Sequence, residues 1–136
     1  MIEKEEFGRF EKQMVLKEIG ILGQTKLKAA KVAVVGAGGL GCPVLQYLVA
    51  AGVGTIGIAD GDVVSVSNLH RQVLYSTKDV GKPKVECAKA RLLAQNPEVK
   101  IDLYNEFISE ENASKIISQY DIIVFFHLRF LSSLVL

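Results

Sequence analysis

Hydrophobic residues follow two kinds of spacing along this chain, and each kind predicts a different element of secondary structure. Near the start, Phe7, Phe10 and Met14 begin a series with intervals of three and four residues. This spacing places the apolar side chains on one face and predicts an amphipathic helix over residues 7–22. Glycines within residues 19–27 predict a break that follows this helix.

Short uninterrupted apolar runs occur between the helical segments. The runs KVAVV and TIGIAD predict strands over residues 31–35 and 55–60 that are buried on both faces. Further strands are predicted over 99–104 and 120–124, helices over 42–51, 82–95 and 109–119, and irregular structure over 61–80. Strands that alternate with helices indicate a parallel sheet with right-handed crossovers. The predicted fold class is therefore α/β, a Rossmann-like parallel sheet with flanking helices, preceded by an N-terminal helix.

Composition and charge exclude several classes of function. The 136 residues hold 16 basic and 15 acidic side chains, so no basic excess is present to neutralise a nucleic-acid backbone. Cys42 and Cys87 are too few for a disulfide framework or a four-ligand zinc site. The charge-dense opening lacks a secretory apolar segment, and the apolar residues 122–136 are interrupted by Arg129 and too short to cross a membrane. We expect a cytoplasmic protein that binds neither nucleic acid nor membrane.

A glycine-rich segment follows the first predicted strand and opens a helix. It contains the pattern G-x-G-x-x-G at Gly36, Gly38 and Gly41, and Asp60 ends the next strand. Glycines allow a tight turn and close approach to a phosphate, the helix N-terminus supplies N–H groups, and the acidic residue can bind ribose hydroxyls. Glycines that serve only a tight turn are the plainer alternative. The placement of Asp60 favours nucleotide binding, and at this point NAD and ATP fit equally well.

Cationic residues beyond the second strand favour a triphosphate. Asn68 and Arg71 lie in the irregular segment, and Lys82 and Lys84 flank Pro83 at a predicted helix start. Arginine and lysine side chains stabilise the charge that develops when a phosphoryl or nucleotidyl group is transferred. A dehydrogenase needs no such cationic pair beside the pyrophosphate, so these residues favour ATP.

Several ordered motifs together resemble the ThiF/MoeB/HesA family of bacterial relatives of the ubiquitin-activating enzymes. The motifs are GAGGLG, D-G-D-x-V-x-x-S-N-L-x-R-Q and G-K-P-K-V-E, and RFEKQMVL is similar to the family's R-Y-x-R-Q-x-x-L. The resemblance implies adenylation of the C-terminal Gly-Gly carboxylate of a ubiquitin-like sulfur-carrier protein with Mg-ATP, in thiamine or molybdopterin biosynthesis, by a homodimer. It places Gly39 and its loop neighbours at the nucleotide, Asp60 at the ribose, and Asn68, Arg71 and Lys84 at the phosphates.

The sequence departs from the family at both ends of this region. Lys12 stands where the family has an arginine that reaches the ATP of the partner subunit, and it keeps only the charge. Phe125 and Leu128 stand where the family's D-C-T-D-N has its two aspartates, the second of which binds magnesium. The zinc-binding cysteine pairs of many members have no counterpart. His127 has no evident partner ligand, and we interpret it as incidental.

These departures lead to a division of the chain and to three competing functions. We expect an N-terminal helical segment over 1–30, a partial ATP-binding Rossmann-like domain over 31–124, and an aberrant apolar tail over 125–136 of a truncated or frame-shifted form. The preferred function is the adenylyltransferase, with Arg71, Lys84 and Lys12 as its catalytic residues. The alternatives are a non-catalytic nucleotide-binding fragment and an NAD-binding oxidoreductase domain.

Overall fold

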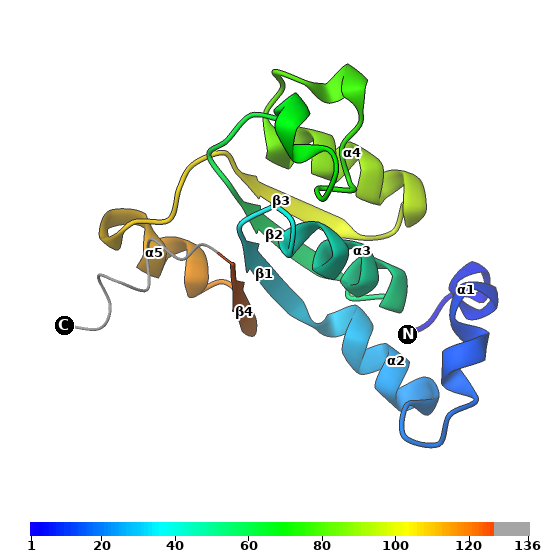
Figure 1. Cartoon of the computed structure of the whole chain (residues 1–136). Coiled ribbons are helices and arrows are strands. Elements are labelled where there is room, and N and C mark those ends of the chain that lie inside the picture. Colours follow the sequence, from blue (N-terminus) through cyan, green and yellow to red (C-terminus); the bar gives the residue numbers. More distant parts are fainter. Residues whose placement is uncertain (127–136) are drawn as a thin grey trace.

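The computed structural model describes residues 1–126, which form a four-stranded parallel sheet with helices on both faces (Figure 1). The helices are α1 (Lys4–Met14), α2 (Gly20–Ala29), α3 (Gly41–Ala51), α4 (Lys84–Gln95) and α5 (Glu110–Ile117). The strands are β1 (Lys31–Val35), β2 (Thr55–Ala59), β3 (Lys100–Tyr104) and β4 (Ile122–Phe125). Two 3-10 turns, Val66–Asn68 and Thr77–Asp79, interrupt the segment between β2 and α4.

The strand order β3-β2-β1-β4 confirms the predicted α/β class. β1 pairs with β2 from Lys31 opposite Thr55 to Val35 opposite Ala59, and with β4 on its other side. Connections α3 and α4 lie on one face of the sheet and α5 lies on the other, as Figure 1 shows. β2 and β3 follow on one side of β1 and β4 lies on its other side, so the strand order switches at β1. Parallel α/β sheets bind ligands beyond the carboxyl ends of strands at such a switch point.

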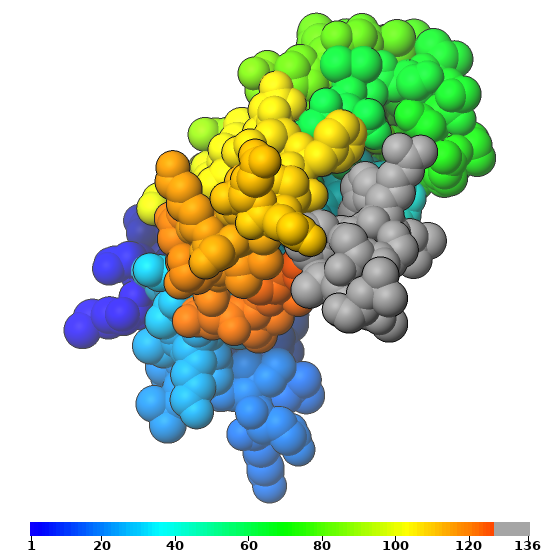
Figure 2. Space-filling model, turned by 90° about the vertical axis from the view of Figure 1, so that its left-hand side faces the viewer, coloured from blue at the N-terminus to red at the C-terminus, as the bar shows by residue number. Residues whose placement is uncertain are grey.

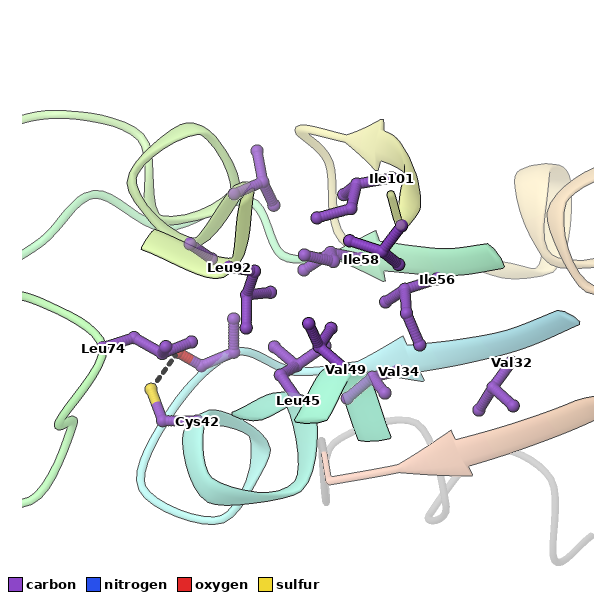
Figure 3. Packing of buried hydrophobic residues seen from close by; sticks show 14 of the residues in the cluster. Val32, Val34, Cys42, Leu45, Val49, Ile56, Ile58, Leu74, Leu92 and Ile101 are labelled. Carbon is purple, nitrogen blue, oxygen red and sulfur yellow. Dashed lines mark hydrogen bonds between the residues drawn. The ribbon is translucent and has the colours of Figure 1, made fainter. Parts of the chain in front are cut away.

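Alternating strand residues build the core between the sheet and the helices α3 and α4. Val34, Ile56 and Ile58 point to this face and are fully buried. They pack against Leu45 of α3 and Leu92 of α4, as Figure 3 shows. The uninterrupted apolar runs that predicted the strands therefore reflect burial on both faces, since Ala33 and Val35, which point to the opposite face, are also buried.

The N-terminal region differs from the prediction, because two helices replace the single helix over residues 7–22. α1 ends at Met14, a turn follows, and Gly20 adopts a positive φ of 55° at the start of α2. The predicted break over residues 19–27 is wrong, since this segment lies in α2. The glycines of α2 lower its intrinsic helix propensity, and tertiary contacts of its buried Gln24 outweigh that cost.

Hydrogen bonds attach the α1–α2 hairpin to the end of α3. The side-chain amides of Gln13 and Gln24 donate to the Ala51 carbonyl oxygen at 2.8 and 3.0 Å, and Gln13 also donates to Gln24. Ala51 is the last residue of α3, where helix carbonyls lack partners within the helix. The hairpin thus lies at the amino ends of the strands, away from the edge where the glycine segment is located (Figure 1).

The remaining predicted elements are confirmed with ends that differ by at most two residues. Seen from the side, α5 and β4 in orange lie between the β3–α4 region and the hairpin (Figure 2). β4 begins at Ile122 rather than at residue 120 and includes Phe125, which pairs with Val35. The interpretations of His127 and Leu128, and those of the remaining residues up to 136, lie outside the described residues. Among the helices of residues 1–126, none is long and apolar enough to cross a membrane.

Candidate functional site

The glycine segment forms a loop between β1 and α3 at the carboxyl end of the sheet. Gly36 has a positive φ of 98°, a conformation that glycine adopts without steric cost. A Cβ atom at Gly41 would overlap the Gly36 carbonyl oxygen, so the loop can close only with glycine there. Within the described residues, the N–H groups of Gly38, Gly39 and Leu40 donate to no protein acceptor. The loop therefore offers free N–H donors next to the N-terminus of α3.

Asp60 lies directly after β2 and faces the glycine loop. Its side chain is buried, its Oδ2 accepts from the Ala37 N–H at 2.8 Å, and its Oδ1 accepts from the Asp62 N–H at 2.8 Å. Each carboxylate oxygen keeps acceptor capacity for a further donor. Asp60 thus links the ends of two neighbouring strands. It therefore has a structural role in addition to the ribose contact that the sequence predicts.

Lys84 begins α4 and carries its charge into the interior. Its side chain is only 6% exposed, and its ammonium lies 3.6 Å from the Asp62 carboxylate, which is itself 61% exposed. The Lys84 N–H also donates to the Asp62 carbonyl oxygen at 3.0 Å, and Val63 forms a β-bridge with Pro83. These backbone contacts hold the start of α4 against the segment that follows β2.

Arg71 reaches the glycine loop from the irregular segment between β2 and α4. A Cβ atom at Gly39 would lie 3.4 Å from the Arg71 Cδ, so the arginine stem lies beside this glycine. The guanidinium donates to the Ser67 carbonyl oxygen at 3.4 Å and lies 3.3 Å from a His70 ring nitrogen. The Asn68 carbonyl oxygen accepts from the Arg71 N–H at 3.1 Å, which shapes the turn that carries the arginine.

A cavity of about 640 Å³ brings most of the predicted site residues together. Gly36, Gly38, Gly39, Gly41, Asp60, Arg71 and Lys84 line it, together with Leu40, Asp62 and Phe126. This volume lies within the usual range for ligand pockets, and the lining combines N–H donors with cations. Asn68 is not among the lining residues. A nucleotide with its phosphates at the glycine loop fits this set of donors.

Lys12 lies on α1, which is at the opposite end of the sheet from the glycine loop (Figure 1). Its side chain is 93% exposed, and its ammonium lies 3.8 Å from Glu11. It lines a separate surface depression with Phe7, Val15 and Ile21. The resemblance assigns this position to the site of a partner subunit, so its catalytic role stays a prediction.

Two buried residues behind the glycine loop were not singled out as site residues by the sequence. The Tyr75 hydroxyl donates to the Ala37 carbonyl oxygen at 2.7 Å. The Gln72 amide lies beside Gly38, and its Oε1 is buried without a hydrogen-bond partner in the described part of the chain. Both residues follow Arg71 in the sequence. In this segment only the apolar residues gave a sign of burial, so no signal pointed to the polar groups of these two side chains.

Cys42 is a packed thiol beneath the glycine loop. Its side chain is fully buried, and its Sγ donates to the Ala37 carbonyl oxygen at 3.5 Å (Figure 3). Burial raises the pKa of this thiol. The thiolate form that attacks electrophiles is therefore disfavoured, despite the position of Cys42 at a helix start. Across residues 1–126, no group of three or more His, Cys, Asp or Glu side chains is arranged to hold a metal ion.

Comparison with known proteins identifies the family. The ThiF family profile matches residues 10–126, which include the glycine loop, Asp60, Arg71 and Lys84. The chain belongs to the ThiF family. The resemblance that the sequence motifs carry is thereby confirmed.

Individual relatives extend this result. The chain is 56% identical over 121 residues to the sulfur carrier protein adenylyltransferase of Thermus thermophilus, covering 89% of this chain and 45% of the relative. It is 45% identical to the probable adenylyltransferase/sulfurtransferase MoeZ of Mycobacterium tuberculosis, covering 90% and 31% respectively. The solved structure of E. coli tRNA N6-threonylcarbamoyladenosine dehydratase, TcdA, in complex with ATP has a TM-score of 0.86 at 28% identity, covering 92% and 51%. The chain thus spans less than half the length of these two curated relatives.

Proposed function

We propose that this chain supplies the ATP-binding part of an adenylyltransferase that activates the C-terminal carboxylate of a ubiquitin-like sulfur-carrier protein. The observation that carries the proposal is the juxtaposition of the buried Lys84 and of Arg71 with a glycine loop that has free N–H groups. Relatives named as sulfur carrier adenylyltransferases support the substrate class. A solved relative in complex with ATP supports the nucleotide.

The proposed reaction is a nucleotidyl transfer. A carboxylate oxygen of the terminal glycine of the carrier attacks the α-phosphorus of ATP and forms a carboxyl-adenylate. The bond from the α-phosphorus to the oxygen that bridges to the β-phosphate breaks, and pyrophosphate leaves with the bonding electron pair. No net proton transfer is required, and the negative charge that collects on the leaving pyrophosphate needs fixed positive partners.

The residues of the cavity have different roles in this nucleotidyl transfer. The free N–H groups of Gly38 and Gly39 and the N-terminus of α3 bind phosphate oxygens. Lys84 and Arg71 compensate the charge of the leaving group, and Asp60 accepts from the ribose hydroxyls. Asn68 acts on the phosphates only by shaping the turn before Arg71, because its side chain does not line the cavity.

Magnesium accompanies ATP in this proposal, and when bound it neutralises phosphate charge. Asp62 is the exposed carboxylate at the cavity and also the partner of Lys84, and the described residues gather no cluster of metal ligands. We therefore assign no step to a metal ligand of this chain. A homodimer in which Lys12 approaches the cavity of its partner, and a cytoplasmic location, complete the proposal.

Calorimetric titration of the chain with Mg-ATP and with NAD tests which nucleotide the cavity binds. We expect ATP to bind more tightly, because Lys84 and Arg71 meet the additional charge of the triphosphate. Tighter binding of NAD would refute the adenylyltransferase proposal and support the oxidoreductase alternative.

Exchange of labelled pyrophosphate into ATP, with and without a sulfur-carrier protein, distinguishes an enzyme from a binding module. Phe125 and Leu128 stand where the family has aspartates, so we expect this chain to bind ATP with little exchange. Replacing residues 125–136 by a family continuation that bears D-C-T-D-N should restore exchange. A restored chain that folds, binds ATP and stays inactive with every carrier would contradict the proposal.

A further inference from the structure

Ala37, at the start of the glycine loop, has both its N–H and its carbonyl group held by hydrogen bonds. Its N–H donates to the Asp60 carboxylate at 2.8 Å. Its carbonyl oxygen accepts from the Tyr75 hydroxyl at 2.7 Å and, more weakly, from the Cys42 thiol at 3.5 Å. Ala37 is fully buried, so these contacts replace water completely. The Ala37 carbonyl and the Gly38 N–H belong to one planar peptide group, so the contact from Tyr75 also fixes the direction of the Gly38 N–H.

Tyr75 reaches Ala37 from the segment that also carries Arg71. Its N–H donates to the Gln72 carbonyl oxygen at 3.2 Å, and its ring packs into the main core beside Leu74. Burial raises the pKa of the Tyr75 hydroxyl, so the group stays protonated and acts as a donor throughout the physiological range. The hydroxyl thus connects two segments that are 38 residues apart in the sequence.

We propose that Tyr75 is a positioning residue for the phosphates of the nucleotide, acting through the Ala37 carbonyl oxygen. Together with Asp60 it fixes the two peptide groups on either side of Ala37, so that the free N–H groups of Gly38, Gly39 and Leu40 keep one arrangement at the cavity. It also fixes the glycine loop relative to Arg71, whose stem lies beside Gly39. This inference rests on the proposed function, because it assumes that the cavity binds ATP.

The substitution Tyr75→Phe removes only the hydroxyl and tests the proposal. Without this donor the loop N–H groups lose their fixed arrangement before ATP binds, and part of the binding free energy is spent on restoring it. We expect the Kd for ATP to rise roughly threefold to tenfold, the range that the loss of one hydrogen bond supports. The Kd for adenosine, which lacks phosphates, should stay within twofold of wild type. Tyr47→Phe is the matched control, since Tyr47 is exposed on α3 and should leave both constants unchanged.

Two further measurements separate positioning from a general loss of structure. Amide hydrogen exchange at Ala37 and Cys42, whose N–H groups donate to Asp60 and to the Gly38 carbonyl oxygen, should be faster in Tyr75→Phe and unchanged in the core strands. An unnatural 4-aminophenylalanine at position 75 retains a donor at the end of the ring and should restore the wild-type ATP affinity. This second variant also serves if Tyr75→Phe fails to fold.

The outcomes are distinct. Wild-type protein that does not bind ATP would refute the proposed function itself. Wild-type protein that binds ATP, with a Tyr75→Phe variant that binds ATP equally well or loses adenosine in the same proportion, would refute only the positioning role of Tyr75.

Discussion

Lys84 is a buried cation whose carboxylate partner is largely in solvent. Its side chain is 6% exposed, whereas the Asp62 side chain 3.6 Å away is 61% exposed and screened by water. Burial of a charge is costly unless close partners compensate it, and one exposed carboxylate compensates this one only in part. A bound polyanion would supply the missing negative charge beside Lys84, so this arrangement favours the binding of phosphate groups.

We predict that Lys84→Met lowers the affinity for ATP by roughly 10-fold to 100-fold, because a charge-assisted contact contributes about 1.5–3 kcal/mol. Methionine keeps the unbranched shape of the stem, so the free energy of unfolding should stay the same or rise slightly. Calorimetric titration and denaturant unfolding measure the two quantities. Lys115→Met, at an exposed lysine of α5 that does not line the cavity, is the control. Equal ATP affinities for both variants would remove Lys84 from the site.

At the scale of elements, β1, the glycine loop and α3 form one strand–turn–helix unit. The loop is tight because the backbone of Gly41 approaches the Gly36 carbonyl oxygen more closely than any side chain would allow. The Cys42 N–H then donates to the Gly38 carbonyl oxygen at 2.9 Å and begins the helix. The same closeness that makes the turn thus places the helix N-terminus at the cavity.

We predict that Gly41→Ala both destabilises the protein and abolishes measurable ATP binding. The added methyl group meets backbone rather than a movable side chain, so the loop must open, at a cost of roughly 1–3 kcal/mol. Thermal unfolding and calorimetry report the two effects. Gly8→Ala is the matched control: nothing lies within 4 Å of its added Cβ, and alanine in α1 should stabilise by about 0.5–1 kcal/mol. A stable Gly41→Ala variant with normal ATP affinity would contradict this account of the loop.

At the scale of the whole molecule, the glycine loop and the α1–α2 hairpin lie at opposite ends of the strands (Figure 1). The hairpin carries several exposed apolar side chains, namely Phe7, Val15, Leu16, Ile21 and Leu22. Apolar residues gathered on one element in this way are typical of protein–protein contacts. Lys12 lies in their midst, which fits the homodimer of the proposed function.

We predict that the chain self-associates and that Leu22→Asp weakens the association at least 10-fold. Leu22 is 80% exposed in the single chain, so the charge should leave the fold intact while it costs free energy in a buried contact. Sedimentation over a range of concentrations gives the dissociation constant. Val66→Asp, at an apolar side chain that is 66% exposed and distant from the hairpin in the sequence, should have no effect. A monomer at high concentration would contradict the prediction.

Local signals in the sequence determined the sheet, the crossover helices and the glycine loop. Five-residue apolar runs such as KVAVV are long enough to define a strand, and the steric demands of Gly36 and Gly41 arise within a few residues. The grouping of Asp60 and Lys84 was also predictable, since both follow the carboxyl end of a strand in a parallel sheet. These features depend on geometry within a few residues, and the spacing of residue types along the sequence reflects that geometry.

Other features of the molecule depend on contacts between segments that are distant in the sequence. The apolar spacing through residues 7–22 continues across the end of α1, so it does not show where this helix ends. Hydrogen bonds from Gln13 and Gln24 to Ala51 hold two separate helices against the end of α3. The hydrogen bond from Tyr75 to Ala37 was invisible for the same reason. A side chain's partner across 38 residues is set by how the layers pack, and a one-dimensional pattern records which residues avoid water but not which groups they meet.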